Sequence, residues 1–166
     1  MTTDNTCDTH TVASSHARNM QIISVMPIPP QNEHTDPQII SVLRSNDTSG
    51  LEISLRDGNW VSVPALGNGP EILLLSDALQ VLTDGQFRSV RHRVMVNSAR
   101  PRVSVIFFGG GGAPPRRERL APLAELVGEG GQRWYRELTW REYKTSAYRT
   151  KLSENRLCYF ETAART

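Results

Sequence analysis

The sequence predicts a mainly β fold, a sandwich or jelly roll with helices at its periphery. Short runs rich in β-branched residues, separated by turn residues, fill the chain from Gln38 onward, and helical spacing follows only near the C-terminus. The 166 residues allow one domain with a single core. Hydrophobic residues make up 38% of the chain and charged residues 22%, a balance typical of a soluble globular protein.

The clearest strand pair is a hairpin. Apolar residues alternate with polar ones over residues 51–55, and the turn sequence Arg-Asp-Gly-Asn leads into a second apolar stretch at residues 60–63. Further strands are predicted at residues 39–43, 71–75, 87–96 and 103–108.

Two helices are predicted near the C-terminus. Residues 119–127 carry leucines at helical spacing. Thr139 and Glu142 have the spacing of a capping box, which indicates a helix over residues 143–152.

The N-terminal segment lacks these patterns. Residues 1–16 are rich in Thr, Ser, Asn, Asp and His, a composition typical of a disordered tail. Prolines interrupt the apolar run that follows at residues 20–28. We therefore expect residues 1–32 to be a disordered segment outside the folded domain.

Charge is distributed unevenly along the chain. Up to Gln86 there are three basic residues against ten acidic ones, and beyond it sixteen against seven. The arginines are scattered and form no run of five like charges, so we expect no nucleic-acid partner. A basic half serves small anionic substrates equally well.

Neither membranes nor disulfide bonds are expected. No apolar run approaches the roughly 18 to 20 residues that cross a bilayer, and the N-terminus has no pattern of a secretory signal. Cys7 and Cys158 are the two cysteines, and we expect both as free thiols. These observations predict a cytoplasmic protein.

Three residues are candidate metal ligands. In a strand, His34 and Asp36 would share one face, because side chains alternate with a period of two. If His92 from a later strand faces them, two nitrogens and one oxygen lie on one side of a metal, the facial triad of non-haem Fe(II) oxygenases. The pattern His-x-Asp also arises by chance, and His92 between two arginines can equally be a partly exposed strand residue.

A second pair of residues suits an anionic co-substrate. Arg102 and Ser104 share one face of a predicted strand, with Val103 on the other. A guanidinium pairs with a carboxylate through two parallel hydrogen bonds, and a hydroxyl beside it can add a third. Such a pair would hold the far carboxylate of a dicarboxylate. The pattern alone is weak, because the chain has many arginines.

The order of these residues resembles that of the plant iron(II)- and 2-oxoglutarate-dependent dioxygenases, and the surrounding segments look like gibberellin 2-oxidases. The matching segments are EHTDPQIISVLRSNDTSGLEI, DALQVLTDGQFRSVRHRVMVNSARPRVSVIFFGG, RERLAPLAELV and LTWREYKTSAYRTKL. The resemblance covers residues 33–161, which we expect to form the dioxygenase domain.

The resemblance implies a partial double-stranded β-helix, or jelly roll, with C-terminal helices. It implies Fe(II) held by His34, Asp36 and His92, and 2-oxoglutarate held by Arg102 with Ser104. The implied reaction uses O₂ to hydroxylate gibberellins at C2, which inactivates the hormone, with ascorbate in support.

The chain departs from the family's pattern at its start. Family members carry a long N-terminal portion with an Asn-x-Tyr sequence whose tyrosine touches 2-oxoglutarate, and residues 1–32 do not match it. We therefore expect an N-terminally truncated chain with the metal-bearing half of the fold. Ser76 also replaces a usual glycine. Two alternatives stay open: an inactive remnant that binds a metal or a partner, and a dioxygenase of another plant metabolite such as a flavonoid.

Overall fold

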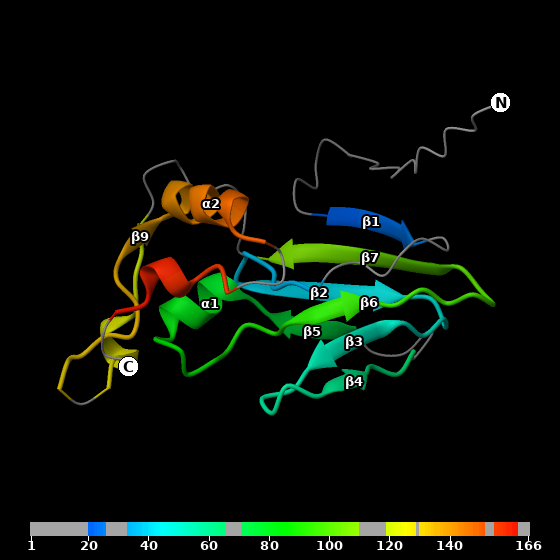
Figure 1. Ribbon diagram of the computed structural model, residues 1–166, viewed down its shortest axis with the longest axis horizontal. Helices are drawn as coiled ribbons and strands as arrows, with labels where there is room; N and C mark the ends of the chain where they lie inside the picture. Colours follow the sequence, from blue (N-terminus) through cyan, green and yellow to red (C-terminus); the bar gives the residue numbers. More distant parts are fainter. Residues whose placement is uncertain are drawn as a thin grey trace.

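The computed structural model describes residues 20–25, 33–65, 71–109, 119–128, 130–151 and 155–162. Most of them belong to β-strands or to the loops that join strands, and helices lie at one end of the molecule (Figure 1). The mainly β architecture with peripheral helices is therefore as predicted.

Two β-sheets face each other. The larger has the order β1 (Met20–Val25), β7 (Arg102–Gly109), β2 (Ile40–Ser45) and β5 (Ile72–Leu75), with all neighbours antiparallel. The smaller has the order β4 (Trp60–Ser62), β3 (Leu51–Ser54) and β6 (His92–Val94). A short sheet pairs β8 (Arg119–Leu120) with β9 (Leu138–Thr139). Helix α1 (Asp77–Leu82) follows β5, and α2 (Trp140–Arg149) follows β9.

The hairpin between β3 and β4 forms where it is predicted. The Leu55 amide donates to the Asn59 carbonyl at 2.8 Å, and the Asp57 side chain accepts from the Asn59 amide at 3.0 Å. Gly58 has φ +85, a conformation that favours glycine. The turn residues therefore close the hairpin themselves.

The two facing sheets enclose a hydrophobic cluster. It contains Leu43 from β2, Leu51 from β3 and Val94 from β6, and Ile72 and Ile106 pack against it. Period-two alternation on each strand turns these side chains to the same interior.

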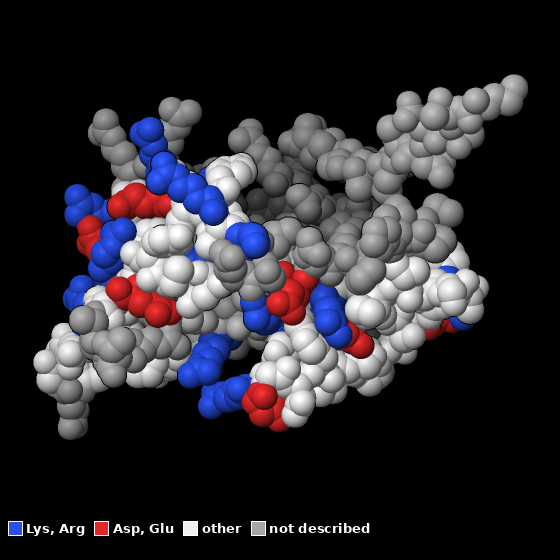
Figure 2. Space-filling view, in the orientation of Figure 1, with Lys and Arg blue, Asp and Glu red and all other residues white. Residues whose placement is uncertain are grey.

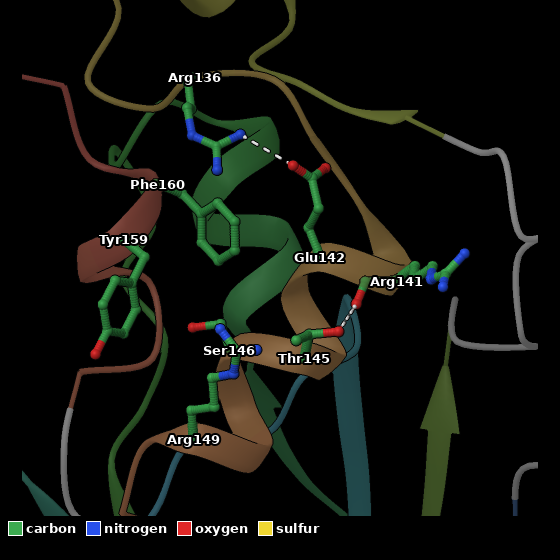
Figure 3. Close-up of a pocket in the computed structure, with 8 residues that line it drawn as sticks. All are labelled: Arg136, Arg141, Glu142, Thr145, Ser146, Arg149, Tyr159 and Phe160. Carbon is green, nitrogen blue, oxygen red and sulfur yellow. Dashed lines mark hydrogen bonds and ion pairs between the residues drawn. The ribbon is translucent and has the colours of Figure 1, made fainter.

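A second hydrophobic cluster lies around α2, where the sequence predicts a single core. Tyr135, Leu138, Tyr143 and Phe160 are buried in it together with Val81 of α1. Figure 3 shows Phe160 next to α2. The C-terminal elements therefore have a core of their own beside the sandwich.

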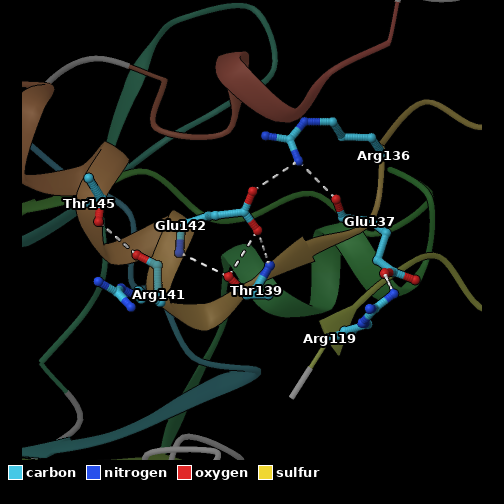
Figure 4. A network of polar contacts seen from close by, with 7 residues as sticks. All are labelled: Arg119, Arg136, Glu137, Thr139, Arg141, Glu142 and Thr145. Carbon is cyan, nitrogen blue, oxygen red and sulfur yellow. Dashed lines mark hydrogen bonds and ion pairs between the residues drawn. The ribbon is translucent and has the colours of Figure 1, made fainter. Parts of the chain in front are cut away.

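Helix α2 begins at the predicted capping box (Figure 4). The Thr139 hydroxyl accepts from the Glu142 amide at 3.2 Å, and the Glu142 carboxylate accepts from the Thr139 amide at 2.7 Å. The hydrogen bonds that the Glu142 carboxylate accepts from the Thr139 amide and from the Thr139 hydroxyl lower the pKa of Glu142. The helix thus starts three residues earlier than predicted and ends at Arg149.

Basic side chains gather at the end of the molecule that holds α2 (Figure 2). Arg141, Lys144 and Arg149 all lie on this helix. The uneven charge of the sequence is therefore also uneven in space. No helix in the described ranges is long and apolar enough to cross a membrane.

The structure also differs from the predicted elements at further places. Residues 119–127 form β8 and a short 3₁₀ turn at Ala124–Leu126; the predicted helix is wrong because Pro122 lacks an amide donor and forces extended backbone before it. A strand is predicted over residues 87–96, but within this range only β6, His92–Val94, is a strand.

Strand β1 lies in the segment expected to be disordered, and its backbone pairs with β7. Cys158 is a free thiol as expected, and Cys7 lies outside the described residues.

The capping box predicts a stability difference. Thr139→Ala removes the side-chain acceptor for the Glu142 amide and should lower the free energy of unfolding by about 1 kcal/mol, measured by urea denaturation. Thr145→Ala is the matched control, an exposed threonine within the same helix, with an expected change within about 0.5 kcal/mol. Equal stabilities of the two variants would contradict a capping role for Thr139.

Candidate metal centre

The two candidate histidines are held together by backbone hydrogen bonds. The His34 amide donates to the His92 carbonyl at 3.0 Å, and the His92 amide donates to the His34 carbonyl at 2.9 Å. Their rings lie with centroids 4.4 Å apart. His34 is an isolated bridge residue and its segment is not a strand, so the expected strand face of His34 and Asp36 is corrected. Pairing with β6 brings the residues together instead.

Asp36 completes a cluster of three possible metal ligands. Its Oδ1 lies 3.8 Å from His34 Nε2, and its Oδ2 lies 3.9 Å from His92 Nε2. One ligand atom from each of the three residues lies within 4.8 Å of the others. The 3.8 and 3.9 Å separations exceed hydrogen-bond length, and the three residues would be close enough to hold one metal ion together.

Neighbouring groups orient two of these ligands. His92 Nδ1 lies 3.0 Å from the Val90 carbonyl, so a proton on Nδ1 satisfies that carbonyl and leaves the Nε2 lone pair free. The Ser41 hydroxyl donates to Asp36 Oδ2 at 2.5 Å. Sequence reasoning missed Ser41, although its inward position on a predicted strand was available as a signal.

Burial favours the neutral imidazole at His92. The side chain is buried, with 6% of its surface exposed, and Asp36 is 8% exposed. Burial lowers the pKa of His92, the Asp36 charge opposes this shift, and His34 adds to it. The neutral imidazole is the form that binds metals.

Arg102 and Ser104 lie on the inner side of β7 as predicted, and Val103 lies on the outer side. Arg102 is 2% exposed, and its Nη1 donates to the Ser104 hydroxyl at 2.5 Å. Burial lowers the pKa of Arg102. Within the described ranges no carboxylate forms an ion pair with this guanidinium, so its charge is buried beside a neutral hydroxyl. A buried cation of this kind suits an incoming anion.

Gly50 allows Arg102 to lie close to the loop that follows β6. Its φ is +144, and a Cβ there would stand 2.6 Å from the Met95 carbonyl oxygen and 3.2 Å from Arg102 Cδ. A larger residue would therefore push against both. Gly50 thus lies between the Arg102 side chain and the loop that follows β6.

A separate cavity of about 440 Å³ lies against α2. Arg136 and Arg149 lie toward opposite ends of it, and Tyr159 and Phe160 form its aromatic wall (Figure 3). None of the candidate metal ligands lines this cavity. Sequence reasoning did not predict it, because its residues come from segments brought together by folding.

Sequence comparison gives close relatives. The chain is 52% identical over 134 residues to gibberellin 2-beta-dioxygenase 1 of Pisum sativum, and 54% identical over 129 residues to gibberellin 2-beta-dioxygenase 1 of Arabidopsis thaliana. The alignments cover 81% and 78% of this chain but 39% and 38% of those relatives. The chain therefore spans about two fifths of the length of the curated relatives it matches.

Solved structures share its fold. The crystal structure of JOX2 in complex with 2OG, Fe and JA matches with a TM-score of 0.71 and 26% identity, over 86% of this chain and 43% of that one. The dioxygenase for auxin oxidation in rice matches with a TM-score of 0.74 and 25% identity, over 86% and 50%. The sheets described above therefore belong to a jelly roll. Residues 15–110 match the family model of the 2OG-Fe(II) oxygenase superfamily, and the chain belongs to this family.

Proposed function

We propose that this chain carries the metal-bearing part of an Fe(II)- and 2-oxoglutarate-dependent dioxygenase that hydroxylates gibberellins at C2 and so inactivates the hormone. The observation that carries the proposal is the buried cluster of His34, Asp36 and His92 in a chain about half identical to gibberellin 2-beta-dioxygenases. We further propose that residues 33–161 form the catalytic domain and that it works in the cytoplasm.

The donor set fits a ferrous ion. Two imidazole nitrogens and one carboxylate oxygen converge, which leaves other coordination positions for co-substrate and O₂. Bound Fe(II) would supply O₂ activation coupled to the oxidative decarboxylation of 2-oxoglutarate, with ascorbate in support. The protein's own part is to hold the ligands in place, through Ser41 at Asp36 and the Val90 carbonyl at His92.

The buried guanidinium fits the co-substrate. Arg102 would pair with the far carboxylate of 2-oxoglutarate, and Ser104 would add a hydrogen bond. Because this cation has no acidic partner among the described residues, a bound dicarboxylate would supply the missing countercharge.

The substrate is proposed to be a gibberellin because of the relatives and the C-terminal segment LTWREYKTSAYRTKL. A carboxylate on the hormone suits the basic half of the chain. The metal ligands would serve another small plant metabolite, such as a flavonoid, equally well, so the substrate must be tested directly.

A second candidate function is suggested by the outer face of the larger sheet. Leu73 is 56% exposed and Phe107 is 48% exposed, and both pair in register with Val42 between them. Val103 and Val105 continue this exposed apolar strip along β7. An exposed apolar strip of this kind favours association with another protein. A chain without turnover would then act by binding a metal at the His34, Asp36 and His92 cluster and a partner protein at this strip.

Turnover and metal retention test the proposed function together. The purified chain, supplied with Fe(II), 2-oxoglutarate, ascorbate and a gibberellin, should form succinate and a 2β-hydroxylated product, detected by mass spectrometry. His34→Ala, Asp36→Ala and His92→Ala should each abolish iron retention and turnover, because each removes one of three ligands. Iron retention without turnover by the parent chain would favour the second candidate, and unchanged retention in all three variants would refute the metal site.

The role of Arg102 is tested by co-substrate binding. Arg102→Ala should weaken 2-oxoglutarate binding by about 2 kcal/mol or more, roughly thirtyfold, because the carboxylate loses a charged partner. Arg100→Ala is the matched control, since that arginine is exposed and pairs with Asp47 at 3.0 Å. Equal 2-oxoglutarate titrations of the two variants, measured by calorimetry, would count against the assignment.

The role of Ser41 is tested by metal affinity. Ser41→Ala removes the hydroxyl that donates to Asp36 Oδ2 and should weaken Fe(II) binding about tenfold under anaerobic titration. Ser62→Ala, an exposed change on β4, should leave the affinity unaltered. A Ser41→Ala protein with the parent's affinity would show that Asp36 needs no such partner.

A further inference from the structure

A buried carboxyl outside the predicted site links the C-terminal core to the metal ligands. Asp77, the first residue of α1, is 2% exposed. It touches neither imidazole in the hydrogen bonds and ion pairs of the described residues, so it is no ligand candidate. Its amide contacts the segment that carries Asp36, and its side chain contacts α2 through Tyr143. Thr35, Ser89 and His92 are further electrostatic neighbours of the carboxyl.

The first amides of α1 hold the segment that carries Asp36. The Asp77 amide donates to the Asp36 carbonyl at 2.8 Å, and the Ala78 amide donates to the Gln38 carbonyl at 3.0 Å. The first amides of any helix have no partner within that helix, so here the metal-bearing segment satisfies them. Because that segment belongs to no strand, the place where α1 begins sets the position of the Asp36 backbone.

The Asp77 side chain is fixed from the opposite side. The Tyr143 hydroxyl of α2 donates to Asp77 Oδ2 at 2.6 Å, and Tyr143 is itself buried. Arg156, which follows α2, interacts electrostatically with both groups. A short hydrogen bond between two buried groups is protected from competing water, so α2 and the start of α1 are joined at one defined point.

We propose that Asp77 is a positioning residue for the metal site: its bond to Tyr143 fixes the start of α1, and its amide then holds Asp36 where the carboxylate faces both imidazoles. This inference rests on the proposed metal site at His34, Asp36 and His92. It gives the C-terminal core a function in metal binding, although none of its side chains is a ligand candidate.

Cobalt(II) binding to the full chain tests this role, by calorimetry for affinity and by the visible absorption spectrum for ligand geometry. Asp77→Ala should weaken Co(II) binding at least about tenfold, and Tyr143→Phe, which removes one hydroxyl, about fivefold. Asp77→Asn keeps an acceptor for Tyr143 and should stay within about threefold of the parent. Both weakened variants should also show an altered Co(II) spectrum.

Thr139→Ala is the control for a purely structural role. It destabilises α2 at the capping box and leaves Asp77 and Tyr143 in place, so its Co(II) affinity and spectrum should match the parent's. Parent-like binding by Asp77→Ala would overturn the role, as would a Thr139→Ala protein weakened as much as Tyr143→Phe. If Asp77→Ala does not fold, Tyr143→Phe decides. A parent chain that binds no Co(II) would overturn the metal site itself, a result distinct from failure of the Asp77 role alone.

Discussion

Two backbone hydrogen bonds between His34 and His92 are the constraint on which the cluster of candidate metal ligands depends. They join an irregular segment to β6 and thereby set one imidazole beside the other. Ordering such a segment costs about 1 to 2 kcal/mol per residue, and the bonds to β6 and to the start of α1 offset part of this cost. The third ligand candidate, Asp36, lies between these two anchors.

The sandwich interior holds polar groups that a hydrophobic core would exclude. Asp36, Ser41, Arg102 and Ser104 are all buried. Burial of such groups costs free energy unless they are paired, and the pairing here is incomplete, because the guanidinium has a hydroxyl and no carboxylate among the described residues. A ferrous ion and a dicarboxylate would complete both sets of contacts. The arrangement therefore has the character of a binding site within a jelly roll.

The sequence correctly predicted those elements whose contacts join residues close together in the chain. The Arg-Asp-Gly-Asn turn, the capping box at Thr139 and the alternation along β7 each depend on neighbours in sequence, and all three are present. Pro122 overrode the leucine spacing that suggested a helix, and α1 is too short to show a helical period. The residues of the metal cluster were predicted, but their convergence depends on the long-range pairing of His34 with His92. Asp77 was missed because its contacts, with the Asp36 carbonyl and with Tyr143, join segments far apart in the sequence.

The most direct test of the account is the position of the metal. Crystals of the chain grown without oxygen, with Fe(II) and 2-oxoglutarate, should give one strong anomalous iron peak between the Nε2 atoms of His34 and His92 and the Asp36 carboxylate. The co-substrate density should run from that peak toward Arg102. An iron peak held by other residues, or a cluster that stays empty at saturating Fe(II), would contradict the central claim.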